Sequence, residues 1–221
     1  MSNKALLFIV FCFLHKIQHV EAQRNSGGYW QQKVQYYVET EIDVETARYS
    51  GTQEIKYTNN SPERLSRVYF HLYYNAFKPG SEMDVRSRTI ADPDSRVLDR
   101  IEKLSTDDQG FLNVVGLKQD GEVLKSSVAG TVLEVQLNKV IEPGETTVFK
   151  MSFKGQAPLV VRRAGKNSKE GVAFSMAQWY PKMAEYDFEG WHANPYIGRE
   201  FYGVWGDFDV KIKIDSRYIV V

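Results

Sequence analysis

The feature that most constrains the fold of this chain is a long stretch near its start in which side-chain character alternates. Between residues 34 and 44, every second position carries a residue that favours β structure, and Gln, Glu or Asp fills most positions between them. The alternating series is Val34, Tyr36, Val38, Thr40, Ile42 and Val44. Successive side chains of a strand point to opposite faces, so this period predicts a long strand with one face in a core and one in water.

The same alternation recurs in five later stretches, and turn-forming residues separate them. The stretches are residues 49–57, 68–72, 131–137, 147–153 and 210–214. The breaks carry Asn and Pro at 59–62, Asp120-Gly121 and Glu142-Pro-Gly144, where Gly and Asn accept positive φ and Pro presets a corner. We expect a hairpin at Asp120-Gly121. Because no stretch has a sustained helical period, the sequence predicts an all-β fold, an antiparallel β-sandwich or saddle.

Residues 78–108 interrupt this pattern with a polar, charged stretch that contains scattered aspartates. The aspartates lack the fixed alternation and closing Glu of a dedicated calcium loop. We therefore expect a solvated loop with one short helical turn, in preference to a calcium site.

Composition excludes several classes of function. The chain has 221 residues, enough for one sizeable core, and its 28 basic and 28 acidic residues cancel. A neutral chain has no long-range field that would attract nucleic acid, so we expect no nucleic-acid partner. The four histidines and the single Cys12 leave little material for a zinc site or a nucleophile with its base.

The first 22 residues have the pattern of a secretory signal peptide. Lys4 precedes an apolar run at 5–14, and a polar region ends at Ala22, with Val20 two positions before it. Ten apolar residues are too few to span a bilayer. We expect cleavage after Ala22, one domain over 23–221, export to the periplasm or the extracellular space, and no transmembrane segment after cleavage. The mature chain would then contain no cysteine and no disulfide.

Aromatic residues are concentrated in the segment from 175 to 210, which has no clean period. They are Trp179, Tyr180, Tyr186, Phe188, Trp191, Tyr196, Phe201, Tyr202, Trp205 and Phe208. Such rings supply apolar area with polar tips, which suits a buried seam between domains or a platform for a ligand such as a carbohydrate. For Trp179, Tyr180 and Trp191 we favour packing in a core or interface over direct contact with substrate.

Three stretches carry a family resemblance. They are Gln178-Trp-Tyr-Pro181 with its continuation to Asp187, the run from Gly190 to Val210, and the strand, Pro-Gly turn and strand of residues 137–155. Together with residues 34–57 and 68–75, they resemble the amino-terminal domain of the aminopeptidase N family of zinc metallopeptidases, particularly its exported bacterial members. The resemblance covers most of residues 30–221, and the block 178–210 is its most specific part.

The resemblance implies a β-sandwich that packs on a thermolysin-like catalytic domain and closes one side of the cavity where peptides bind. In the family, that second domain carries His-Glu-x-x-His, a further Glu ligand and a Gly-x-Met-x-Asn segment. This sequence contains none of them, since Leu72 follows His71 and Ala193 follows His192. We therefore expect no catalytic residue here, zinc in the parent enzyme but not on this chain, and a catalytic domain encoded beyond Val221, where a strand pattern is still running.

The resemblance also implies a Gln or Glu that helps hold the amino group of the peptide. By its place in the matching block, Gln178 is the candidate, because an amide oxygen accepts a hydrogen bond from an ammonium without adding charge. The alternative is that Gln178 satisfies backbone groups in an irregular loop. Glu185 is a weaker candidate that we expect at the surface, and Asp187 is expected to be a turn residue.

A second reading remains open: a free-standing exported β-sandwich module with the aromatic segment as a platform for carbohydrate or peptide. A third is a structural sandwich domain of a surface assembly. Retained ligand binding by the isolated chain would favour the second reading, whereas exposed apolar area that makes the isolated chain aggregate would favour an absent partner domain.

Overall fold

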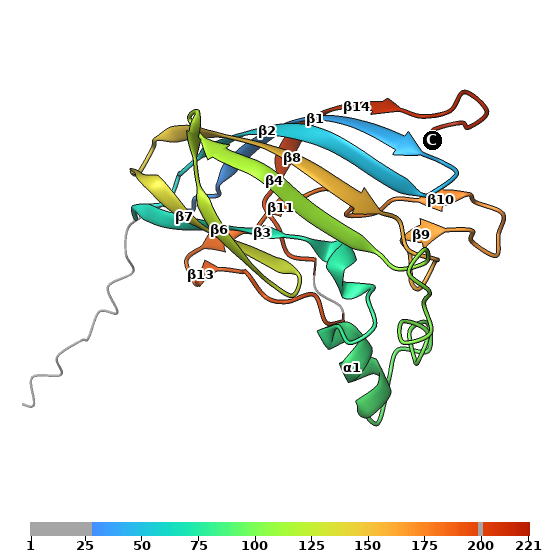
Figure 1. Cartoon of the computed structure of the whole chain (residues 1–221). Helices are drawn as coiled ribbons and strands as arrows, with labels where there is room; N and C mark the ends of the chain where they lie inside the picture. Colours follow the sequence, from blue (N-terminus) through green and yellow to red (C-terminus); the bar gives the residue numbers. More distant parts are fainter. Residues whose placement is uncertain (1–27, 199–200) are drawn as a thin grey trace, which may run out of the picture.

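The computed structural model describes residues 28–198 and 201–221, and the predicted signal peptide lies outside these residues. One layer is a six-stranded sheet (Figure 1). Its strands, in spatial order, are β14 (Gly206–Lys213), β1 (Lys33–Asp43), β2 (Arg48–Thr58), β8 (Thr146–Gln156), β4 (Phe111–Gln119) and β5 (Glu122–Val123).

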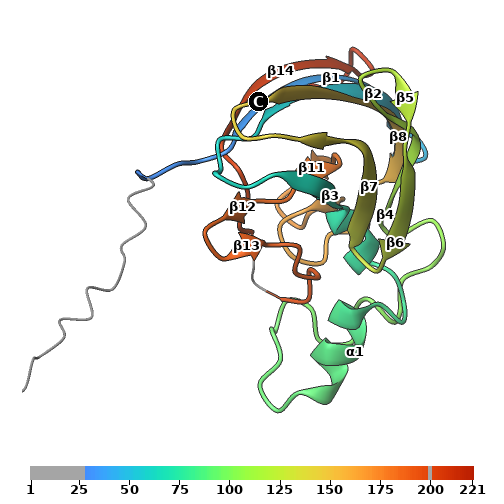
Figure 2. The same ribbon diagram turned by 90° about the vertical axis from the view of Figure 1, so that its left-hand side faces the viewer.

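The second layer is a four-stranded sheet, over which the larger sheet curves (Figure 2). Its strands, in order, are β11 (Lys182–Met183), β3 (Leu65–His71), β7 (Val132–Ile141) and β6 (Lys125–Ala129). Two short hairpins complete the fold: β9 (Gly165–Lys166) with β10 (Phe174–Ser175), and β12 (Tyr186–Asp187) with β13 (Gly190–Trp191). The predicted all-β sandwich is confirmed. Within the described ranges, no helix is long and apolar enough to cross a membrane.

The period-two pattern of β1 places one side of the strand in the core. Val34, Tyr36 and Val38 are at most 2% exposed, while the residues between them face outward or lie at intermediate depth. On β8, Phe149, Met151 and Phe153 face the same core. Burial of such a side chain stabilises the fold by about 1.5–3 kcal/mol, so the core between the sheets is the main source of stability. The predicted hairpin at Asp120-Gly121 is present and joins β4 to β5.

One strand differs from the antiparallel expectation. β14 pairs with β1 in parallel, in a register that runs from Val34 opposite Gly206 to Glu41 opposite Lys213. Parallel neighbours need a long crossover connection, and here nearly the whole domain intervenes between the two strands. Alternation along a single strand carries no information about the direction of its neighbour, which is why the sequence did not reveal this pairing.

The Pro-Gly turn at 142–145 also differs from a hairpin, because β7 and β8 belong to different sheets. The turn is the corner at which the chain passes from the smaller sheet to the larger one. Asn59 holds this corner: its backbone N–H donates to Glu145 O at 2.9 Å, its carbonyl accepts from Gly144 N, and its side chain donates to Ile141 O at 3.1 Å.

Residues 78–108 are more ordered than a solvated loop, so that expectation was wrong in part. After the short helix η1 (Tyr73–Ala76), the chain forms α1 (Glu82–Thr89), which projects from the sandwich (Figure 1). Ser81 caps α1 by accepting from the N–H of Asp84. The fully buried Asp84 carboxylate accepts from Arg88 Nε and Nη2 at 3.0 and 3.1 Å. After α1, the chain returns to the sandwich, where the side chain of Ile101 is fully buried.

Two glycines make room for aromatic rings on the inner face of the larger sheet. A Cβ on Gly155 would lie 2.2 Å from the ring of Tyr49, and one on Gly51 would lie 2.6 Å from the ring of Phe153. Because a side chain would displace these rings, the glycines fix where Tyr49 and Phe153 lie. Tyr49 matters below, since its hydroxyl contacts the aromatic segment.

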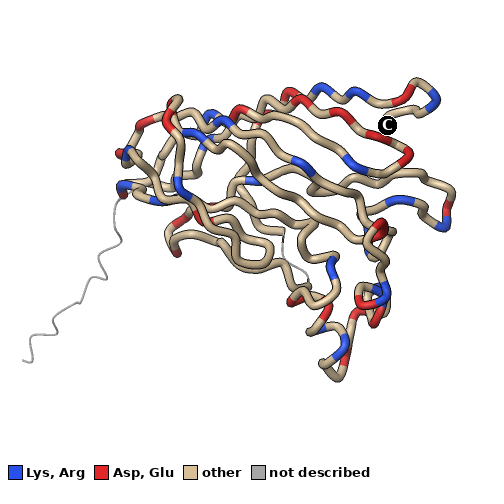
Figure 3. The backbone as a smooth tube through the Cα atoms, in the orientation of Figure 1, with Lys and Arg blue, Asp and Glu red and all other residues tan. Residues whose placement is uncertain are grey.

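Lys and Arg are interspersed with Asp and Glu over the fold (Figure 3). On the outer face of the β1–β14 pair, Lys211 pairs with Glu39 at 2.8 Å and Lys213 with Glu41 at 2.7 Å. Exposed pairs of this kind contribute little to stability, so they favour the register of β14 without dominating it.

His71 is a strand histidine, as the sequence indicated, but it is only 3% exposed. Its ring stacks on Tyr73 with centroids 4.9 Å apart, and neither ring nitrogen has a hydrogen-bond partner among the described residues. Burial lowers the pKa of His71 to about 4. The neutral imidazole is therefore the form that the fold accommodates.

This burial predicts a loss of stability in acid. The unfolded chain protonates His71 below about pH 6.5 and the folded chain only below about pH 4, so the free energy of unfolding falls as the pH drops between these values. Lowering the pH from 7.5 to 5 should cost about 2 kcal/mol through this residue alone. Urea titrations at both pH values measure it. In His71→Phe the pH dependence should shrink by this amount, and an unchanged pH dependence would contradict the assignment.

Candidate functional site

The aromatic segment lies along the open side of the sandwich and is bound to the inner face of the larger sheet. Tyr49 Oη donates to Trp179 O at 2.7 Å, and Gln53 Nε2 donates to Pro181 O at 2.9 Å. The backbone N–H of Met183 donates to Tyr36 Oη at 3.0 Å. Since β11 then pairs with β3 of the smaller sheet, residues 179–183 link both layers.

Gln178 begins this linked stretch in a left-handed backbone conformation, with φ of 59°. Its side chain is half-buried, and the amide oxygen Oε1 is buried without a hydrogen-bond partner among the described residues. A non-glycine residue at positive φ is uncommon and costs conformational energy, so the neighbouring hydrogen bonds at 179 and 181 hold it there. The role of Gln178 in binding substrate stays a prediction.

Trp179 and Tyr180 are half-buried and pack against the core. The ring of Trp179 lies 5.8 Å from Tyr49 and 5.9 Å from Phe153, and Tyr180 lies 5.6 Å from Tyr36. Trp191 likewise packs against the core, 5.0 Å from Tyr186. Inward packing is thus the arrangement that the structure shows for all three rings.

Other aromatic side chains of the segment are exposed around a cavity of about 300 Å³. Phe188 is 86% exposed and Trp205 is 82% exposed. The cavity is also lined by Tyr202, Glu185 and Asp187. The sequence favoured inward packing of Trp179, Tyr180 and Trp191, but it did not identify the accessible rings, because a segment without a period does not reveal which of its residues point outward.

Glu185 lies on the wall of this cavity and is only 7% exposed, so the expectation that it lies at the surface was wrong. The chain turns inward between β11 and β12, which places the carboxylate against the core. Its hydrogen bond comes from the backbone N–H of Tyr186 at 3.2 Å. Burial raises the pKa of Glu185, because a charged carboxylate with few partners is poorly solvated there.

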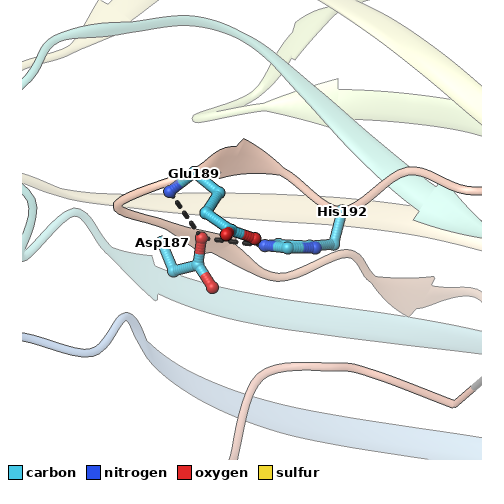
Figure 4. A group of neighbouring side chains, drawn as sticks. All are labelled: Asp187, Glu189 and His192. Atoms are coloured by element: carbon cyan, nitrogen blue, oxygen red, sulfur yellow. Dashed lines mark hydrogen bonds and ion pairs between the residues drawn. The ribbon is translucent and has the colours of Figure 1, made fainter.

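Asp187, Glu189 and His192 form a cluster on the β12–β13 hairpin (Figure 4). Asp187 Oδ1 accepts from the Glu189 N–H at 2.8 Å and lies 2.8 Å from His192 Nε2, while Tyr202 Oη donates to Asp187 Oδ2 at 2.9 Å. Burial raises the pKa of Asp187, but these hydrogen bonds outweigh it, and the net pKa is lowered. The bond to Asp187 raises the pKa of Tyr202 to about 12.

Asp187 acts as a turn residue, as expected, because it accepts the N–H two positions on. The sequence carried a signal for the cluster that we did not use. Phe188 and Glu189 form the turn between β12 and β13. Gly190, with φ of 99°, adopts the left-handed backbone conformation that follows this turn. A hairpin of this kind brings His192 back beside Asp187.

Comparison with protein-family models and with curated proteins finds no match to this sequence. Solved structures do match. An M1 zinc metallopeptidase mutant from Deinococcus radiodurans is 17% identical with a TM-score of 0.41, covering 67% of this chain and 26% of that one. A two-domain M1 zinc metallopeptidase mutant bound to L-arginine is 15% identical with a TM-score of 0.47, covering 85% of this chain and 33% of that one.

A third structure, an M1 zinc metallopeptidase mutant from Deinococcus radiodurans bound to a Tyr-Ser-Ala substrate, is 16% identical with a TM-score of 0.46. The match covers 83% of this chain and 33% of that chain. The present chain therefore spans about a third or less of the length of the structures that it matches. These likenesses are distant.

The described histidines do not fit the catalytic zinc of the aminopeptidase N family. His71 is enclosed by the core beside Tyr73, and His192 follows a strand and not a helix. Two histidines one helical turn apart are needed to face one metal, and the two described histidines, His71 and His192, are not such a pair. No step of zinc catalysis is assigned to these residues.

The packing of the rings predicts different effects for two tryptophans of the segment. Trp179→Ala removes a ring that packs on Tyr49 and Phe153, so it should lower the free energy of unfolding by about 3 kcal/mol. Trp205→Ala is the matched control: its ring is 82% exposed, and the change should stay within about 0.5 kcal/mol. Urea denaturation followed by circular dichroism measures both. Equal effects would contradict the inward packing of Trp179.

Proposed function

We propose that this chain is the non-catalytic amino-terminal domain of an exported zinc-dependent aminopeptidase, a hydrolase that removes amino-terminal residues from peptides. In this proposal the domain packs on a thermolysin-like catalytic domain and helps hold the amino terminus of the peptide. The observation that carries it is the Gln-Trp-Tyr-Pro element at 178–181, which resembles the family's element and is held in a fixed shape by the core.

The state of Gln178 supports a role in binding. Its amide oxygen is buried and without a partner among the described residues, which costs about 1–3 kcal/mol in a finished structure. An acceptor of this kind is satisfied if an ammonium group donates to it. The α-amino group of a peptide is such a donor, and the strained backbone at Gln178 keeps the acceptor in place.

Uncovered apolar surface supports packing against a second domain. On β14, the side chains of Phe208, Val210 and Ile212 are 40–47% exposed, although they lie on the face that continues the core. Beside them lies a cavity of about 540 Å³ whose lining includes Ile212, Trp179 and Tyr218. Contiguous apolar area of this kind marks a surface for another protein part.

Export is part of the proposal and rests on the signal-peptide pattern of residues 1–22. The metal of the parent enzyme would be held by the second domain, because the family's catalytic zinc ligands lie there and this sequence contains no His-Glu-x-x-His motif. The direct test is the coding sequence beyond Val221. A His-Glu-x-x-His motif within roughly 200 residues, about one domain, is expected, and its absence would refute catalysis by the parent protein.

Substitution of Gln178 in the complete enzyme tests the binding role. Gln178→Ala should raise KM for an aminoacyl-4-nitroanilide about tenfold, the effect of losing one hydrogen bond to a charged group, with a smaller change in kcat. Gln136→Ala, which alters an exposed glutamine on β7, is the control and should leave both constants unchanged. Unchanged KM in the Gln178 variant would assign that residue a structural role only.

Substitution on β14 tests the packing of the domain. Ile212→Lys places a charge on the uncovered apolar face, so it should abolish co-purification of this chain with a separately expressed catalytic domain while changing the stability of the isolated chain by less than about 1 kcal/mol. Lys211→Gln, on the opposite face of the same strand, should leave co-purification intact. Equal effects of the two substitutions would show that β14 is not the contact surface.

The exposed rings around the 300 Å³ cavity favour one alternative, a free-standing exported module that binds carbohydrate or peptide. Flat aromatic side chains such as Trp205 and Phe188 suit stacking against a ligand. Binding of glycans or peptides to the isolated chain, lost in Trp205→Ala, would support this alternative over the aminopeptidase domain.

A further inference from the structure

The β12–β13 hairpin gathers three side chains of metal-ligating type that have no part in the proposed aminopeptidase function. Asp187 and Glu189 each offer a carboxylate oxygen and His192 offers a ring nitrogen, and these donor atoms all lie within 4.8 Å of one another. Figure 4 shows the Glu189 carboxylate beside the His192 ring and the Asp187 carboxylate facing the same point. The hairpin alone therefore supplies a compact N,O,O donor set.

The donors are held in place by hydrogen bonds from outside the set. Tyr202 Oη donates to Asp187 Oδ2 at 2.9 Å, which leaves Oδ1 directed toward His192. The backbone N–H of His192 donates to Glu185 O at 2.9 Å, and the imidazole lies edge-on to the Tyr202 ring with centroids 4.6 Å apart. Partners of this kind orient metal ligands and reduce the ordering cost of binding.

The surroundings of the cluster independently favour a cation. Glu185, two residues before Asp187, is 7% exposed and lines the same cavity, and among the described residues its carboxylate accepts one hydrogen bond, from the Tyr186 N–H at 3.2 Å. Among the described residues, no lysine or arginine forms an ion pair with Glu185, Asp187 or Glu189, and the one ion pair of the cluster joins Asp187 to His192. Three carboxylates thus share little positive charge, and a bound cation would offset their repulsion.

We propose that Asp187, Glu189 and His192 form a binding site for a divalent transition-metal ion, for which Zn²⁺ is the best-fitting biological candidate. One imidazole and two carboxylates match the ligands that Zn²⁺ takes, with a fourth position for water. Ca²⁺ and Mg²⁺ fit less well, because their sites are built from oxygen donors.

The geometry requires one small movement. Tetrahedral zinc places neighbouring ligand atoms about 3.3 Å apart, so the 2.8 Å contact between Asp187 and His192 must open by about 0.5 Å as the metal replaces the shared proton. Glu189 is exposed and can rotate to complete the set. The bound ion would fasten the hairpin.

Zinc titration of the 221-residue chain tests the site, because this chain has no His-Glu-x-x-His motif to bind catalytic zinc. Isothermal titration with ZnCl₂ should give one site per chain. His192→Gln and Asp187→Asn should each weaken binding at least tenfold, as loss of a direct ligand does. Glu122→Gln, an exposed carboxylate on β5, is the matched control and should stay within twofold of the unchanged chain. CaCl₂ should give at least tenfold weaker binding than ZnCl₂.

Glu189→Gln keeps the test decisive even if the other two variants loosen the hairpin, because Glu189 is exposed and its side chain forms no hydrogen bond or ion pair among the described residues. It should weaken zinc binding by threefold or more while leaving the near-ultraviolet circular dichroism unchanged. Absence of binding at millimolar ZnCl₂ would overturn the proposal. So would binding that persists within twofold in His192→Gln, which would assign the ion to other residues, such as His15 and His19.

Discussion

Three buried polar side chains on the inner face of the larger sheet determine how the rest of the molecule is arranged. Tyr36, Tyr49 and Gln53 are at most 3% exposed, and each is hydrogen-bonded to the backbone between residues 179 and 183. Without that backbone, each polar tip would lie unsatisfied in the core at a cost of about 1–3 kcal/mol. The sandwich and the aromatic segment therefore fold as one unit, although more than 120 residues separate the bonded partners along the chain.

This dependence explains how an irregular segment presents functional groups in fixed positions. Gln178 immediately precedes the first of these hydrogen bonds, and the inward rings of Trp179 and Tyr180 continue the core. Beyond β11, the same segment turns outward into the β12–β13 hairpin, where Asp187 and His192 meet. One face of the segment is thus structural, and the residues at its two ends are available for a peptide amine and for a metal ion, as proposed.

The sequence predicted most of the strands of seven residues or more, and the failures have identifiable causes. Alternation identified β1, β2, β3, β7 and β8 because one face of each strand is buried. It missed β4, where a bulge between Val115 and Lys118 and a positive φ at Gly116 break the period. For the candidate site, the sequence located the segment and favoured inward packing of Trp179, but it placed Glu185 at the surface, since burial of a single carboxylate follows from the path of the chain and not from its neighbours.

What the sequence by itself determined is local. Alternation defined the strands and their buried faces, the Asn, Asp, Pro and Gly residues defined the turns, and the sequence contains no His-Glu-x-x-His motif. Only the tertiary structure decided the parallel pairing of β14 with β1, the Pro-Gly corner between the sheets, and the meeting of Asp187, Glu189 and His192 beside Tyr202. The physical reason is that alternation reports burial of one strand face, whereas strand direction, the choice of sheet and the contacts of a loop depend on which distant polar groups and apolar surfaces satisfy one another.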